Sequence, residues 1–104
     1  MPDERPRRST EVMDQPEQAV KLPTLFRVVL HNDDYTTMEF VVQVLEQVFL
    51  LHPAEAYRVM MQVHCHGRGV CGVYPYEIAE TKVGLVHAMA RERGFPLRAT
   101  TEEA

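Results

Sequence analysis

An amide and two carboxylates stand side by side in the segment LHNDDYTTMEF, residues 30–40. Asn32, Asp33 and Asp34 follow an apolar run and come just before an expected helix start. Two adjacent carboxylates repel each other, so their pairing suggests either a positively charged ligand or acid–base catalysis. The simpler interpretation is that the carboxylates only stabilise the turn and the N-terminus of the helix after it.

A second group of reactive side chains occurs in HCHGRGVC, residues 64–71. The spacing argues against zinc: His64 and His66 are two residues apart and diverge on a helix, whereas zinc ligands usually come as C-x2-C or H-x3-H pairs. No flanking cationic motif or C-x-x-C sequence marks a reactive thiol. We therefore expect no metal site, and we expect Cys65 and Cys71 to be small buried hydrophobic residues.

Two further hypotheses concern the first group. A hydrolase or metal-dependent enzyme could use Asp33 or Asp34 as general base and His64 as acid. However, the sequence has no nucleophile motif, no glycine-rich phosphate loop and no cofactor fingerprint, so we expect no cofactor. Alternatively, Asn32, the carboxylates and a neutral His64 are acceptors for the three donors of an ammonium group.

The ammonium hypothesis gains support from apolar residues that could form a pocket behind these acceptors. They are Met38, Val41, Met60, Val63 and Leu97, with Thr36 beside them. Methionine suits a pocket that accepts several shapes. Acceptors at the rim and an apolar hole behind them would suit the N-terminus of a polypeptide with a bulky first side chain.

Composition and charge argue against several other classes of function. The chain has 104 residues, enough for one domain, and a formal net charge of −4. With this charge, and with no cluster of Lys and Arg on any expected face, we expect no nucleic-acid binding. No apolar run approaches the roughly 18 residues of a membrane-spanning helix, and the N-terminal residues lack the apolar core of a secretory signal. We expect a cytoplasmic protein without membrane contact.

The chain divides into two parts. Residues 1–22 carry five acidic and four basic residues and three prolines, and such a composition predicts a flexible extension. Residues 23–104 are expected to form the core domain. Its pattern predicts a strand over 25–32, a helix that starts at Thr36, a helix from Pro53 to Gly67, a strand over 67–75, a helix over 76–93 and a strand over 95–101. Thr36 and Glu39 are expected to form a capping box.

This order, β-α-α-β-α-β, predicts an α+β fold in which a small three-stranded antiparallel sheet packs against three helices. The third helix should bury Ala79, Val83, Val86 and Ala90 and direct Glu77 and Lys82 away from the core.

Four stretches resemble the ClpS family of adaptors: VVLHNDDYTTMEFV, the pair Val63-His64, VCGVYPYEIAETKV and FPLRATTE. The similarity covers about residues 24–103. It implies a non-enzymatic adaptor that binds N-degron proteins beginning with Leu, Phe, Tyr or Trp and delivers them to a ClpA-type AAA+ unfoldase for degradation by ClpP. Two positions depart from the family pattern. Thr37 stands where Pro is usual, and His52 stands where an acidic residue is frequent.

The resemblance also assigns roles to residues. It implies that Asn32, Asp33 and His64 hold the α-amino group of the substrate, with Asp34 alongside. It implies that the apolar residues named above receive the first side chain. The docking face for the N-terminal domain of the unfoldase would contain Glu77 and Lys82, with Glu80 nearby.

Overall fold

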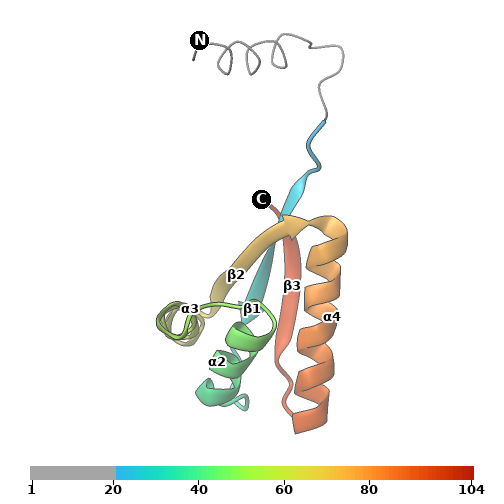
Figure 1. Ribbon diagram of the computed structural model, residues 1–104. Helices are drawn as coiled ribbons and strands as arrows, with labels where there is room; N and C mark the ends of the chain where they lie inside the picture. Colours follow the sequence, from blue (N-terminus) through green and yellow to red (C-terminus); the bar gives the residue numbers. More distant parts are fainter. Residues whose placement is uncertain (1–20) are drawn as a thin grey trace, which may run out of the picture.

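The computed structural model describes residues 21–104 (Figure 1). The expected flexible extension, residues 1–22, therefore lies outside the described residues except for its last two, which are exposed and belong to no helix or strand. The elements are β1 (Leu25–His31), α2 (Met38–Gln47), α3 (Pro53–His66), β2 (Arg68–Pro75), α4 (Tyr76–Arg93) and β3 (Arg98–Glu103). The predicted order and the α+β class are confirmed.

The three strands form one antiparallel sheet in the order β2-β1-β3, with β1 in the centre (Figure 1). Val28, Val29 and Leu30 of β1 are all buried. Because side chains alternate along a strand, Val28 and Leu30 face one side and Val29 the other. Val28 and Leu30 belong to the main hydrophobic cluster, whereas Val29 does not.

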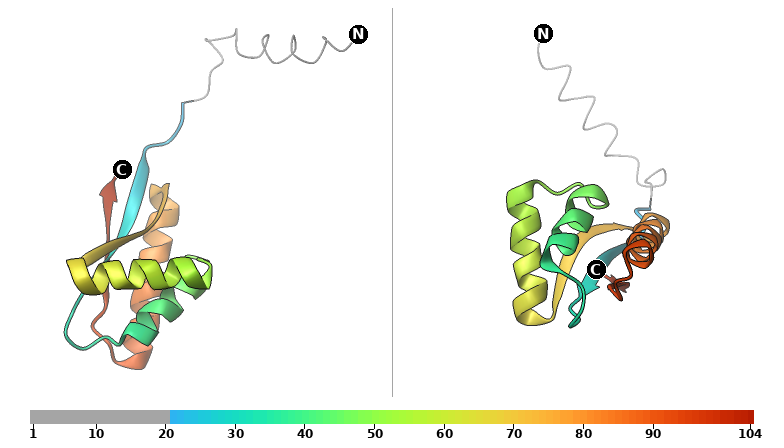
Figure 2. Two further views of the ribbon diagram at one scale, coloured as in Figure 1. Left: turned by 90° about the vertical axis from the view of Figure 1, so that its left-hand side faces the viewer. Right: turned by 90° about the horizontal axis from the view of Figure 1, so that it is seen from below.

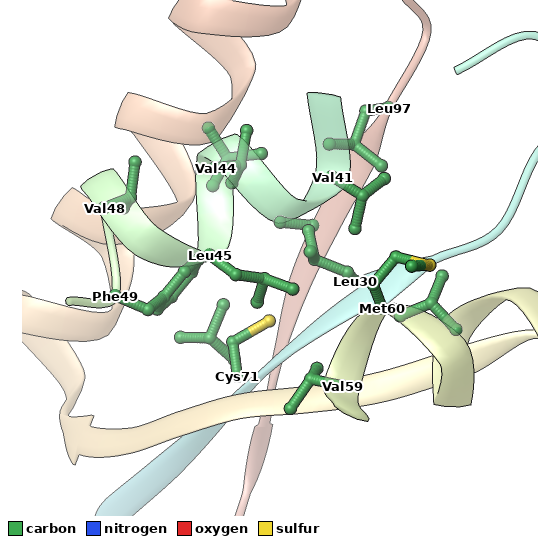
Figure 3. Close-up of a cluster of buried hydrophobic side chains, with 14 of the residues drawn as sticks. Leu30, Val41, Val44, Leu45, Val48, Phe49, Val59, Met60, Cys71 and Leu97 are labelled. Carbon is green, nitrogen blue, oxygen red and sulfur yellow. The ribbon is translucent and has the colours of Figure 1, made fainter. Parts of the chain in front are cut away.

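All three helices contribute to that cluster, so they pack on the Val28 and Leu30 side of the sheet. The right-hand view of Figure 2 shows α2 beside α3, and α4 on the far side of α2 from α3. Figure 3 shows side chains of α2 and α3 meeting Leu30 and Cys71 of the sheet. Burial of each large aliphatic side chain contributes about 1.5 to 3 kcal/mol, so this cluster fixes the positions of α2 and α3.

Two helix ends border the turn after β1 and the start of β2. The N-cap of α2 is Thr37, whose Oγ1 accepts a hydrogen bond from the Phe40 N–H at 3.1 Å. The predicted Thr36 cap is wrong because Thr36 is held in the preceding turn by Asp33. The C-terminus of α3 is capped by Gly67, which adopts a φ of 87° that favours glycine.

Glycine is also required where α3 meets β2. A Cβ on Gly69 would lie 2.8 Å from Cγ2 of Val63 and 3.2 Å from the carbonyl oxygen of Val59. The helix therefore lies directly on the strand, and this contact positions Val63.

The last strand begins later than predicted, at Arg98 rather than Phe95. Gly94 ends α4 in the left-handed conformation, and the Phe95 N–H still donates to the Ala90 carbonyl. Pro96 has no N–H to offer a sheet. The chain can pair with β1 only after these residues.

Candidate functional site

A cavity of about 270 Å³ opens where the end of β1, the start of α2 and the C-terminal half of α3 meet. Nine of the ten residues expected at the substrate site line it: Asn32, Asp33, Asp34, Thr36, Met38, Val41, Met60, Val63 and His64. The fold thus brings together two segments that are far apart in the sequence.

Backbone hydrogen bonds connect these two segments. The Asn32 N–H donates to the Gly67 carbonyl at 2.9 Å, and the Gly67 N–H donates to the Val63 carbonyl at 2.9 Å. The first bond joins the turn after β1 to the end of α3. This link places Asn32 close to His64, one turn before the helix end. Sequence analysis marked Gly67 only as a helix stop and missed its role as an acceptor.

Asp33 shapes the turn. Its Oδ1 accepts from the N–H groups of Tyr35 at 2.8 Å and Thr36 at 2.7 Å, and its Oδ2 accepts from the Thr36 hydroxyl at 2.7 Å. Burial opposes ionisation, but these hydrogen bonds outweigh it and lower the pKa of Asp33 below its ordinary value. A carboxylate offers about four acceptor positions, so Asp33 holds the turn with three and retains about one.

The other polar groups of the rim point into open space. Asn32, Asp34 and His64 are exposed. Within residues 21–104, none of their side chains takes part in a hydrogen bond or ion pair, and no Lys or Arg lines the cavity. The rim therefore presents unused acceptors and negative charge.

The floor of the cavity is apolar. Val41, Met60 and Val63 are buried, whereas Met38 in the first turn of α2 remains 41% exposed at the entrance. The tenth expected residue, Leu97, does not line the cavity. It is buried in the hydrophobic cluster together with Val41 (Figure 3). The arrangement suits a ligand with a cationic head and an apolar body.

Neither cysteine belongs to this site. Among residues 21–104, no three His, Cys, Asp or Glu side chains are grouped so that they could hold a metal ion. Cys71 is buried, and burial raises the pKa of its thiol to about 12. The prediction that both cysteines are buried is wrong for Cys65, which is exposed because it lies outside the stripe of α3 residues that faces the core.

The charged face of α4 differs from the prediction. Glu77 and Glu80 are exposed, but Lys82 does not extend into solvent. Its Nζ donates to the Val48 carbonyl at 2.7 Å and lies 5.6 Å from the ring centroid of Tyr74. The long aliphatic stem of a lysine lets its ammonium reach a neighbouring helix end, and here that end is the C-terminus of α2.

No helix in the described part of the chain combines the length and apolar character needed to cross a membrane.

Known proteins are similar to this chain in sequence, and one solved structure is similar in fold. The family description "ATP-dependent Clp protease adaptor protein ClpS" matches residues 21–100. The ClpS adaptor of Nitratidesulfovibrio vulgaris (strain Miyazaki F) is 59% identical over 96 residues, which are 92% of this chain and 94% of that protein. The ClpS adaptor of Wolinella succinogenes is 54% identical over 94 residues, 90% of each chain. The solved structure of Agrobacterium tumefaciens ClpS2 bound to L-phenylalaninamide superposes with a TM-score of 0.77 at 44% identity and covers 80% of this chain and 100% of that one.

Proposed function

The chain belongs to the ClpS family of Clp protease adaptor proteins, and we propose that it recognises substrates by their free N-terminal residue, held in the cavity between α2 and α3. As a ClpS protein it is an adaptor and not an enzyme. The observation that carries the proposal is a rim of unused acceptors above an apolar floor.

The rim accounts for recognition of the amine. A protonated α-amino group has three donors and one positive charge. The Asn32 side-chain oxygen, a ring nitrogen of His64 and the remaining acceptor position of Asp33 would take these donors. Asp34 adds negative charge beside them. Hydrogen bonds to charged groups contribute about 1.5 to 3 kcal/mol each.

The floor accounts for recognition of the first side chain. L-phenylalaninamide, the ligand of the Agrobacterium protein, has a free amine, a benzyl side chain and an amide in place of its carboxylate, as the first residue of a polypeptide does. A cavity of about 270 Å³ with two methionines can accept Leu, Phe, Tyr or Trp. We therefore propose N-degron proteins that begin with these residues as the substrates.

Delivery is the remaining part of the proposed function. We propose that the face of α4 with Glu77, Glu80 and Lys82 docks on the N-terminal domain of a ClpA-type unfoldase, which passes substrates to ClpP. Since this proteolysis consumes ATP, the proposed location is the cytoplasm.

Residues 1–22 are proposed to act as an extension needed for the hand-over. Deleting them should preserve peptide affinity, because every lining residue lies between Asn32 and His64, but should abolish accelerated degradation of an N-degron substrate. Delivery at the full rate by the truncated protein would contradict this role.

Calorimetry with a peptide series that varies only the first residue tests substrate recognition. Peptides that begin with Leu, Phe, Tyr or Trp should bind, and peptides that begin with Ala or Glu should not. Acetylating the Leu peptide removes the charge and two donors, so its affinity should fall at least about tenfold. Equal binding of acetylated and free peptides would reject amine recognition.

A further inference from the structure

The side of the sheet away from the helices carries a regular array of side chains. We call it the outer sheet face. Its nine residues form three rows across β2, β1 and β3: Arg68–His31–Arg98, Val70–Val29–Thr100 and Val73–Arg27–Glu102. None of these nine belongs to the hydrophobic cluster that the helices cover. A bulge between Val28 and Val29 keeps Val70 and Val73 in register with β1.

The array concentrates positive charge on an acidic protein. Residues 21–104 contain eight Lys and Arg residues and ten carboxylates. Three of those cations, but only one carboxylate, lie on the outer sheet face. The expectation that no face gathers Lys and Arg is therefore wrong. The three arginines come from three strands that are distant in the sequence, and only the register of the sheet aligns them.

The charges are not all neutralised within the face. Glu102 Oε2 accepts from Arg27 Nε at 3.4 Å and also pairs with Arg68. Arg98 is exposed and has no carboxylate partner among residues 21–104. Burial, and after it the charges of Arg98 and Arg68, lower the pKa of His31, and only Glu102 opposes them. The uncompensated charge therefore sits on the row that contains Arg98.

Apolar surface adjoins this charge. Val70 and Val73 of the edge strand β2 are 38% and 46% exposed, whereas Val29 in the middle of the central row is 1% exposed. A ligand that covers the face would thus meet guanidinium groups and two valine side chains together. An extended polypeptide that carries carboxylates and apolar side chains in turn at every second residue has the matching pattern, because every second side chain of an extended chain points to the same side. A polyphosphate or nucleic acid would gain nothing from the valines.

We propose that the outer sheet face is a docking surface for an acidic, extended segment of a partner protein, with Arg98 and Arg68 as its anchors. Asn32 directly follows His31 in the sequence, but the cavity opens on the helix side of the sheet. The outer sheet face is therefore separate from the substrate cavity. It is also separate from Glu77 and Lys82 of α4. The proposal therefore does not depend on the proposed recognition of N-terminal residues.

The probe for this surface is a labelled peptide with Glu and Val in turn at every second residue and Ser between them, acetylated so that no free amine can enter the cavity. Its control has Gln in place of Glu. Fluorescence anisotropy with the full chain should show binding of the Glu peptide at least about tenfold tighter than binding of the Gln peptide, weakening as salt is added. Amide shifts in NMR spectra should concentrate in β1, β2 and β3 and leave the first turn of α2 unchanged.

Charge reversal at a single position identifies the anchor. Arg98→Glu should weaken binding of the Glu peptide about tenfold, because it replaces the unpaired cation with a like charge. Arg91→Glu makes the same change in net charge at an exposed position of α4 and should change affinity less than twofold. Both variants should keep the circular dichroism spectrum and unfolding temperature of the wild type, which verifies that both are folded.

Three results would overturn the proposal. The Glu and Gln peptides could bind equally or not at all. Arg91→Glu could weaken binding as much as Arg98→Glu, which would make the effect one of net charge alone. A single-stranded oligonucleotide of equal charge could bind more tightly than the Glu peptide with the same dependence on Arg98, which would assign the surface to nucleic acid.

Discussion

At the cavity, the side chains of Asn32, Asp34 and His64 have no hydrogen-bond partner within residues 21–104, while backbone hydrogen bonds hold Asn32 and the end of α3. On α4 the reverse is found, because the ammonium of Lys82 already donates to the Val48 carbonyl. At the cavity the fixed backbone loses little further entropy when a ligand binds, and each side chain loses only its own rotamer freedom. A side chain that already serves the fold must first give up its partner. Substitutions should therefore change binding at the cavity and stability at Lys82.

Asp33 should give the largest effect, because it both shapes the turn and faces the ligand. Asp33→Ala removes the three hydrogen bonds from Tyr35 and Thr36 that hold the turn after β1. We expect affinity for a Leu-starting peptide to fall by more than about tenfold, since each net hydrogen bond contributes about 1 kcal/mol. Asp33→Asn can keep both backbone hydrogen bonds and should lose less. Calorimetry compares the two variants, and wild-type affinity in Asp33→Ala would contradict the assignment.

The same residue predicts a pH dependence of stability. The pKa of Asp33 is lowered in the folded protein, so the folded state favours the ionised carboxylate. Its contribution to stability is fully present above the unfolded value, near about 3.9, and is lost as pH falls through the lower folded value. The stability advantage of wild type over Asp33→Asn should therefore shrink under acidic conditions. Urea unfolding at a series of pH values measures it, and a constant difference would contradict the prediction.

His64 should have the next largest effect. It is exposed at the rim and would accept a hydrogen bond from the ammonium only while its ring is neutral. His64→Ala should weaken peptide binding about fivefold to tenfold, because it removes one acceptor of the ammonium group. His66→Ala is the matched control, since it is an exposed histidine on the same helix outside the cavity. Equal effects of the two substitutions would remove His64 from the site.

Met38 should control selectivity more than affinity. It lies at the cavity entrance and is 41% exposed, so truncating it costs little stability. Side chains branched at Cβ are stiff and carry bulk close to the backbone, where Met38 would meet them. Met38→Ala should therefore reduce the preference for Leu over Ile or Val several-fold in competition binding. Glu39→Ala in the same turn is the control. An unchanged preference in Met38→Ala would place discrimination elsewhere.

The contrast between the cavity and α4 also explains what the sequence could predict. Helix and strand order followed from local signals such as Pro53 and Gly67, and nine expected site residues do line one cavity because the turn after β1 and the end of α3 are each locally encoded. Side-chain partners across elements were not predictable. The spacing of Thr36 and Glu39 favoured Thr36 as the cap, and only the hydrogen bonds of Thr36 to Asp33 leave the cap to Thr37.

The remaining differences between prediction and structure come from contacts between residues that are far apart in the sequence. Lys82 and Val48 are 34 positions apart, and nothing near Lys82 in the sequence marks its partner. The arginines of the outer sheet face meet only through the strand register. Leu97 is apolar and near the end of α4, but it faces the core and not the cavity.

The smallest effects are expected for Glu77 and Lys82 of α4, and these two residues should differ from each other. Lys82→Ala leaves the Val48 carbonyl without its donor and should lower the free energy of unfolding by about 1 kcal/mol. Glu77→Ala changes an exposed side chain and should alter it by less than about 0.5 kcal/mol. Glu77→Ala is therefore the cleaner test of proposed docking on a ClpA-type N-terminal domain. It should weaken that association while stability and peptide affinity remain at wild-type values. If Glu77→Ala binds the domain normally and Lys82→Ala loses both stability and docking, the lysine contributes to the fold and the docking face lies elsewhere.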